Sequence, residues 1–193
     1  MNIDISNTDN KYGIIYTDPP WQQSKGGFKK SRPNSTGVSV DYPTMSVSEI
    51  KELHKIIFDN LVEEDHNVFM WVIDKYLIEA EQFMNELGYT RHARFVWDKV
   101  TGMAPAFTVR FCHEYLLWFY KKGHLLKPCD EMRGKYSTVM REQVTAHSKK
   151  PLCAYEMIDN MFPDVKKLEL FARNEYKDWD CWGNQTNMFK KIG

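Results

Sequence analysis

An aspartate, two prolines and a tryptophan follow one another at Asp18-Pro19-Pro20-Trp21. They come directly after Tyr12–Thr17, a run of β-branched and aromatic residues that predicts a buried strand. The tetrad would therefore lie at the carboxyl end of a strand, which is where open α/β sheets bind their ligands. A carboxylate, fixed carbonyl groups and a flat ring at that place could hold a small planar group for reaction.

The chemistry that suits this tetrad is attack by an exocyclic amine, such as the amino group of adenine. The lone pair of that nitrogen is delocalised into the ring, so two acceptors on its N–H bonds would free it for attack. Asp18 supplies one acceptor, and the carbonyl of Pro19 could supply the other because proline fixes φ. Trp21 offers a face on which an extruded base could stack. The alternative is that the prolines only end the strand and Trp21 packs into the core.

The composition limits the class of protein. A chain of 193 residues fits one domain, 1–193, with a sizeable core. Lysine and arginine total 26, as do aspartate and glutamate, so any basic surface must be local. The four cysteines are scattered, without the spacing of a zinc site or a disulfide framework, and we expect no metal. We find no signal sequence or membrane span, and we expect a cytoplasmic protein without membrane contact.

The segment after the tetrad, 22–41, is interpreted as a flexible substrate loop. Its first part is polar, basic and glycine-containing and has no periodicity. Long loops in compact domains are usually functional or disordered. Lys29, Lys30 and Arg32 would lie beside the tetrad, where they could contact phosphate. The alternative is a loop that is merely solvated.

Strands and helices alternate along the rest of the chain. Ser46 and Glu49 form a capping box at the start of an amphipathic helix, and 67–73 is an apolar run typical of a strand buried on both faces. Further helices are predicted at about 75–87 and 151–161, and further strands at 90–100, 112–120, 137–141 and 167–172. The alternation predicts an α/β fold with a mostly parallel central sheet and helices on both faces. The strands around Trp97 and Trp118, which no helix separates, could form an antiparallel edge pair.

In their order, these motifs resemble the MT-A70 family of adenine-N6 methyltransferases, which use S-adenosylmethionine. The compact prokaryotic and phage members are the most similar. The resemblance extends over about 12–185, nearly the whole chain. It implies a Rossmann-like methyltransferase fold with a permuted motif order, in which the catalytic Asp18-Pro19-Pro20-Trp21 comes first and the cofactor-binding half, 147–185, comes last.

The resemblance also implies roles for residues on the substrate side. Tyr42 lies in a segment similar to the family's Tyr-x-Thr-Met, whose tyrosine is near the target base. Trp71 ends a hydrophobic strand similar to one that ends in tryptophan. Lys99 lies in a Trp-x-Lys segment, and Glu114 lies in a His-Glu segment. The last two residues could instead form a structural ion pair.

The cofactor-binding residues implied by the resemblance are Asp18, Lys150, Arg173, Asn174, Asn184 and Gln185. Lys150, before Pro151, is similar to the lysine that meets the carboxylate of the cofactor's methionine portion. A lysine at a helix start is disfavoured by the helix dipole, which indicates an anionic ligand beside it; the alternative is a flexible surface lysine. Several relatives have His-Asn where this chain has Asn174-Glu175, a departure that puts the adenosine contacts at these two positions in doubt.

The function implied is transfer of a methyl group from S-adenosylmethionine to the N6 amino group of adenine in DNA. RNA is an alternative polymer for the same chemistry. A non-catalytic, nucleic-acid-binding subunit is an alternative of another class, although such subunits usually lose the tetrad. The small size leaves little room for a target-recognition domain, so a second copy or another subunit is a further expected partner.

Overall fold

The computed structural model describes residues 1–22, 43–100, 109, 111–145 and 149–183. They form a seven-stranded sheet in the order β5-β3-β4-β2-β1-β6-β7. The strands are β1 (Tyr12–Thr17), β2 (Val62–Val72), β3 (Tyr89–Asp98), β4 (His113–Lys121), β5 (Val139–Arg141), β6 (Lys167–Leu170) and β7 (Asp180–Trp182). The helices are α1 (Val47–Asn60), α2 (Leu77–Glu86) and α3 (Leu152–Met161), with short 3-10 helices η1 (Asp74–Tyr76) and η2 (Asp130–Met132).

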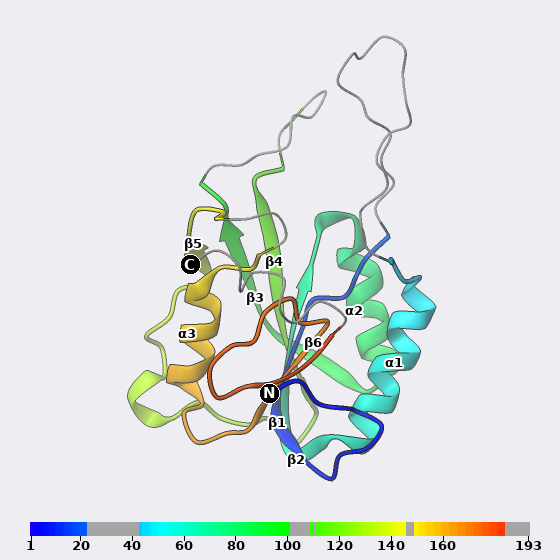
Figure 1. Cartoon of the computed structure of the whole chain (residues 1–193). Coiled ribbons are helices and arrows are strands. Elements are labelled where there is room, and N and C mark those ends of the chain that lie inside the picture. Colours follow the sequence, from blue (N-terminus) through cyan, green and yellow to red (C-terminus); the bar gives the residue numbers. More distant parts are fainter. Residues whose placement is uncertain (23–42, 101–108, 110, 146–148, 184–193) are drawn as a thin grey trace, which may run out of the picture.

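Helices cover both faces of the sheet, with α1 and α2 on one face and α3 on the other (Figure 1). Each face has its own cluster of buried apolar side chains. Ile15 of β1 belongs to the cluster under α1 and α2, and Tyr16 belongs to the cluster under α3, because successive side chains of a strand point to opposite faces. The predicted α/β fold is therefore confirmed. Within the described ranges, no helix has the length and apolar character needed to cross a bilayer.

Strand β4 runs antiparallel to both of its neighbours, whereas the other neighbouring strands pair in parallel. Its pairing with β3 confirms the predicted antiparallel pair. The pair lies toward one side of the sheet, with the short β5 outside β3. Because β4 runs in reverse, it begins at the edge where the parallel strands end, so that Glu114 pairs with Trp97 and Tyr115 pairs with Val72. The reversal brings Glu114 to the edge that also carries Asp18.

The main differences from the prediction concern β2, β7 and the start of α3. Strand β2 begins at Val62, ahead of the apolar run, because its polar first half pairs with the start of β1 before a register shift. Strand β7 was missed; it has three residues and is held by parallel pairing with β6. Pro151 is the residue before the first turn of α3 rather than a member of that turn.

The strand order reverses at β1, because the chain continues to β2 on one side of β1 and later returns to β6 on the other side. From β1 the chain leads through α1 to β2 on one side, whereas β6, on the other side of β1, is reached through α3. The crevice outside the carboxyl ends of two such strands is the usual ligand site of open α/β sheets. Asp18 follows β1, and Phe171 follows β6, at this position.

Buried His54 connects α1 to the end of β1. Its Nδ1 lies 2.7 Å from the carbonyl oxygen of Ile50, which can only accept, so Nδ1 carries the hydrogen. Nε2 then accepts from the hydroxyl of Thr17 at 3.1 Å. Thr17 directly precedes Asp18, so this contact helps to fix the start of the tetrad.

We expect His54 to make the fold sensitive to mild acid. Burial lowers the pKa of His54 from 6.5 to about 4. The folded state resists the proton that the unfolded chain takes up, so its contribution is fully favourable above pH 6.5 and is lost as the pH falls toward 4. The loss is on the order of 3 kcal/mol. Urea titrations from about pH 7 to pH 5 should show a smaller pH dependence of the free energy of unfolding in His54→Leu. Equal slopes in the two proteins would contradict this role.

Candidate active site

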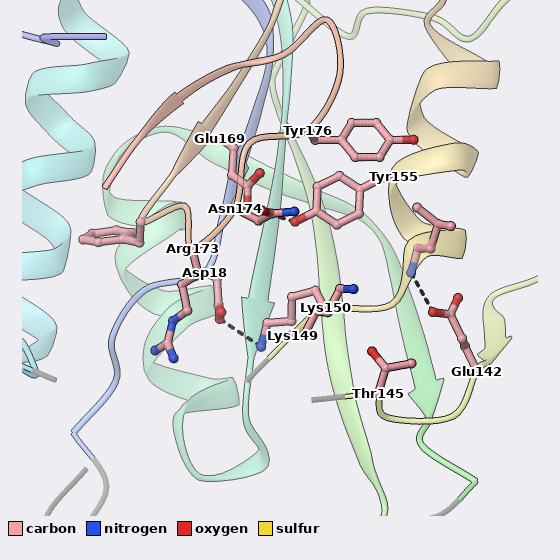
Figure 2. Close-up of a pocket in the computed structure, with 12 residues that line it drawn as sticks. Asp18, Glu142, Thr145, Lys149, Lys150, Tyr155, Glu169, Arg173, Asn174 and Tyr176 are labelled. Carbon is pink, nitrogen blue, oxygen red and sulfur yellow. Dashed lines mark hydrogen bonds and ion pairs between the residues drawn. The ribbon is translucent and has the colours of Figure 1, made fainter. Parts of the chain in front are cut away.

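A cavity of about 270 Å³ opens at the carboxyl ends of β1 and β6 (Figure 2). It is bounded by the residue after β1, the segments before and within the start of α3, and the segment after β6. The lining residues are Asp18, Glu142, Thr145, Lys149, Lys150, Leu152, Tyr155, Glu169, Phe171, Arg173, Asn174 and Tyr176. Four predicted site residues, Asp18, Lys150, Arg173 and Asn174, are thus brought together. Its polar groups converge on one small space, as in small-molecule sites.

Four alternating charges form a chain beside the cavity. The Nζ of Lys150 lies 3.0 Å from Oδ1 of Asp18 and 2.7 Å from Oε2 of Glu114. The Nζ of Lys99 lies 2.5 Å from Oε1 of Glu114. These side chains are only 11–20% exposed, so their pairing must offset a substantial desolvation cost. The structure therefore forms the ion pair between Lys99 and Glu114 that was the alternative to direct substrate binding.

The pairing sets the charge of each member of the chain. Burial would lower the pKa of Lys150, but the carboxylates of Asp18 and Glu114 outweigh burial and raise it. Burial would raise the pKa of Glu114, but the two ammonium groups lower it to about 2. Burial raises the pKa of Asp18 above 3.8, and Lys150 opposes that rise. The ammonium of Lys150 thus stabilises the ionised form of Glu114 and counteracts the effect of burial on Asp18.

Lys150 keeps capacity for a further anion. An ammonium group has three hydrogens, and two are directed at Asp18 and Glu114. The third has no oxygen acceptor among the described residues, and Lys150 lines the cavity, which suits the predicted contact with a carboxylate. Lys150 is not the flexible surface lysine of the alternative interpretation.

The structure corrects the prediction that Trp71 contacts the substrate. Trp71 is 1% exposed, and its Nε1 donates to the hydroxyl of Tyr16 at 2.6 Å. Its ring centroid lies 5.1 Å from the Nζ of Lys150. Trp71 thus packs behind the site, where its ring supports the ammonium of Lys150.

Within the tetrad, Trp21 lies in the core instead of offering a face to a base. It is 4% exposed and stacks on Tyr76 with ring centroids 5.1 Å apart, and its Nε1 donates to the carbonyl of Trp71 at 3.0 Å. Burial of a large ring with its N–H bonded explains why this alternative is adopted. The carbonyl of Pro19 accepts the backbone N–H of Trp21 at 2.8 Å, and its second lone pair could still accept from a substrate amine. Pro20 directs its carbonyl to the N–H of Met45.

Six other predicted site residues lie outside the described residues, and their roles stay predictions. They are Lys29, Lys30, Arg32, Tyr42, Asn184 and Gln185.

The sequence did not reveal that Glu142 caps α3. Its two carboxylate oxygens accept the backbone N–H groups of Leu152 and Cys153 at 2.7 and 2.8 Å. Pro151, the residue at the N-cap, provides no side-chain hydrogen bond. Glu142 belongs to the segment after β5, outside the local window in which capping motifs are found. The first amides of α3 are therefore bound by an internal carboxylate.

Replacing Glu142 by alanine should lower the free energy of unfolding by about 1–2 kcal/mol, because two amides at the helix start lose their acceptor. Glu142→Gln keeps one acceptor oxygen and should lose less. Glu156→Gln is the matched control, since this exposed residue of α3 makes no such contact with the helix start. Urea titration of the three variants measures the effect. Equal stabilities of Glu142→Ala and Glu156→Gln would show that the cap has little weight.

Glu169 is a further acid in the cavity. In the sequence it stands as a charged residue in an apolar strand, and the sequence analysis assigned it no role. It is 5% exposed, and its Oε1 accepts from the hydroxyl of Tyr155 at 2.9 Å. Tyr155 in turn stacks on Tyr176, with ring centroids 4.6 Å apart. The cavity thus combines the carboxyl groups of Asp18, Glu142 and Glu169, the ammonium of Lys150 and an aromatic wall. This set fits a small ligand that carries both positive and negative charge and a flat ring.

The sequence of this chain is similar to those of several known proteins. A family model described as MT-A70 matches residues 12–185. A type II methyltransferase, M.MunI, from Mycoplasma sp is 31% identical over 189 residues, which cover 90% of this chain and 77% of that protein. The N(6)-adenosine-methyltransferase catalytic subunit METTL3 of Homo sapiens is 26% identical, covering 92% of this chain and 28% of the human protein. An N(6)-adenosine-methyltransferase MT-A70-like protein of Arabidopsis thaliana is 27% identical, covering 94% and 24%.

Proposed function

This chain belongs to the MT-A70 family of methyltransferases, and on that premise we propose that it transfers a methyl group from S-adenosylmethionine to the N6 amino group of adenine in DNA. The observation that carries the proposal is the position of Asp18. Its carboxylate lines the cavity at the carboxyl end of β1, is held 3.0 Å from Lys150, and is followed by the carbonyl of Pro19. These are the two acceptors that an adenine amino group needs.

S-adenosylmethionine, when bound, supplies an electrophilic methyl group on a positively charged sulfur. The chain's own residues would bind the cofactor and the target base and orient them for the transfer. The remaining N–H of Lys150 would hold the cofactor's carboxylate, and the acids of the cavity would face its positive charges. Asn174 and Arg173 line the same cavity and are proposed as further cofactor contacts. Asn184 and Gln185 are proposed to bind the nucleoside.

Asp18 and the carbonyl of Pro19 would accept the two N–H bonds of the target amine and direct its lone pair at the methyl group. Orientation of this kind can supply ~7–11 kcal/mol in favourable cases. Asp18 would also accept the proton that the amine loses, directly or through water. Glu114 and Lys99 would act behind it by holding Lys150 in place.

We favour DNA because the chain covers 77% of the Mycoplasma type II methyltransferase but only about a quarter of the eukaryotic N(6)-adenosine-methyltransferases. The predicted basic residues Lys29, Lys30 and Arg32 would contact phosphate, and Tyr42 would lie near the target base. A second copy or another subunit is proposed to add target recognition.

The test uses labelled S-adenosylmethionine with unmethylated duplex DNA, single-stranded DNA and RNA in parallel. The products are digested to nucleosides and examined for N6-methyladenine. Label in DNA with the wild type, but not with Asp18→Ala, is the expected result. Asp65→Asn, at an exposed aspartate in the first half of β2, is the control and should keep wild-type transfer. Label only in RNA would show that the substrate is RNA rather than DNA. Cofactor binding without transfer to any polymer would favour the non-catalytic subunit, and absence of cofactor binding would overturn the proposal.

A further inference from the structure

The side chain of Glu169 lies in the cavity with one oxygen unused. It is 5% exposed, and Oε1 accepts from Tyr155. Its Oε2 is buried and has no hydrogen-bond partner among the described residues. A buried carboxyl oxygen without a partner is unfavourable, and more so when the group is ionised. This atom therefore marks a place in the cavity where a ligand group would be stabilised.

Lysines and an arginine line the same cavity, but in the described part of the chain none of them forms an ion pair with Glu169. Tyr16 and Cys181 are its register partners on β1 and β7, Tyr155 faces it from α3, and Asp18 adds a second negative charge in the cavity. Arg173 lines the cavity too, but no ion pair with Glu169 is present in the described part of the chain. Lys167 of the same strand is paired with Asp159 instead.

Glu169 consequently holds a proton when no cation is near. Burial raises the pKa of Glu169 to about 8; the hydrogen bond from Tyr155 opposes the rise and the charge of Asp18 adds to it. Asp18 differs because Lys150 compensates its charge at 3.0 Å. Of the three acids in the cavity, Asp18 is paired with Lys150 and Glu142 accepts two amides of α3, whereas Glu169 has no paired cation among the described residues.

We propose that Glu169 distinguishes the positively charged methyl donor from its uncharged thioether product, because its unpartnered oxygen meets the sulfonium charge. The inference rests on the proposed function and adds a residue that sets cofactor specificity. The donor and the product share the same carboxylate, ammonium and nucleoside. They differ in the sulfonium, so a carboxylate facing this group would bind the donor in preference to the product.

Proton release measures this role without any methyl transfer. Calorimetric titration of the wild-type chain in two buffers of different ionisation enthalpy gives the number of protons released on binding. The ligands are S-adenosylmethionine, S-adenosylhomocysteine, and an analogue with an amine in place of the methylsulfonium group. Near neutral pH we expect the two cationic ligands to release approaching one proton more than S-adenosylhomocysteine. Below pH 8, the affinity for the cationic ligands should increase about tenfold for each unit by which the pH is raised. This increase is in addition to any pH dependence that the thioether shows.

Glu169→Gln should abolish the difference in proton release and reduce the preference for the sulfonium about tenfold or more. Glu156→Gln, the same change at an exposed position of α3, is the matched control and should behave as wild type. If Glu169→Gln does not fold, Tyr155→Phe serves instead. It removes the hydrogen bond that opposes the rise in the pKa of Glu169, so the pH midpoint of donor affinity should move upward.

The outcomes separate this inference from the proposed function. Equal proton release with S-adenosylmethionine and S-adenosylhomocysteine would overturn the inference while leaving the cofactor site in place. An unchanged midpoint in Tyr155→Phe would also overturn it. Failure of the wild type to bind all three ligands would overturn the proposed function itself.

Discussion

Asp18→Ala should reduce the rate of methyl transfer by about a thousandfold or more while leaving the protein folded. A positioned acid–base group typically contributes 10²–10⁴ in rate, and Asp18 would also orient the amine. Asp18→Asn keeps the size of the side chain but loses its charge, and should be nearly as inactive. Single-turnover transfer of labelled methyl groups at saturating cofactor measures the effect.

The protein should survive this change because Lys150 keeps its contact of 2.7 Å with Glu114. The variant must be compared with Asp65→Asn, which changes an exposed aspartate of β2. A folded Asp18→Ala protein that binds cofactor and turns over at nearly the wild-type rate would remove Asp18 from the mechanism.

Lys150→Met should lower the free energy of unfolding by roughly 3–5 kcal/mol, the usual cost of removing one partner from a buried ion pair. Asp18 would lose its partner at 3.0 Å, and Glu114 would keep only Lys99. The variant should also lose affinity for the cofactor, since the N–H proposed to bind its carboxylate is gone. Urea titration and calorimetric cofactor binding measure the two effects.

Lys149→Met is the matched control for stability, because Lys149 is an exposed lysine directly before Lys150. Its free energy of unfolding should change by about 0.5 kcal/mol or less, as at most surface positions. Equal destabilisation of the two variants would show that Lys150 is not held by its buried carboxylates.

The pH dependence of the free energy of unfolding at acidic pH provides a further test of Lys150→Met. The pKa of Glu114 is lowered from 4.5 to about 2 in the folded protein, so its contribution is present above pH 4.5 and is lost as the pH falls toward 2. In Lys150→Met the lowering should be smaller, because Lys150 is the stronger of the two opposing charges. The loss of stability between these pH values should therefore be smaller than in the wild type.

Local patterns predicted the features that local energetics decide. The capping box of Ser46 and Glu49 is present at the start of α1. The apolar run before Asp18 forms β1, and the paired tryptophan strands form β3 and β4. Periodicity and capping concern residues within one or two turns, so they can be read directly from the sequence.

Contacts between distant segments could not be predicted in this way. Trp21 could either stack on a ligand or enter the core, and only the position of Tyr76 decides between them. Glu142 caps a helix that begins ten residues later, beyond any capping motif. The unpaired oxygen of Glu169 depends on which groups three different elements place around it. Each case is set by tertiary packing, which overrides local preference.

The strand order also determines when the site can form. Strands β3 and β4 are consecutive in the chain and can pair early, because the entropic cost of closing a loop is lower when fewer residues separate its ends. The cavity instead requires β6 to pair with β1, and these strands are separated by most of the sequence. Such non-local pairing is slow and comes late in folding. On a ribosome, a chain that has already assembled α1 through β4 would still lack the cavity that we propose as the cofactor site until β6 has emerged and joined β1.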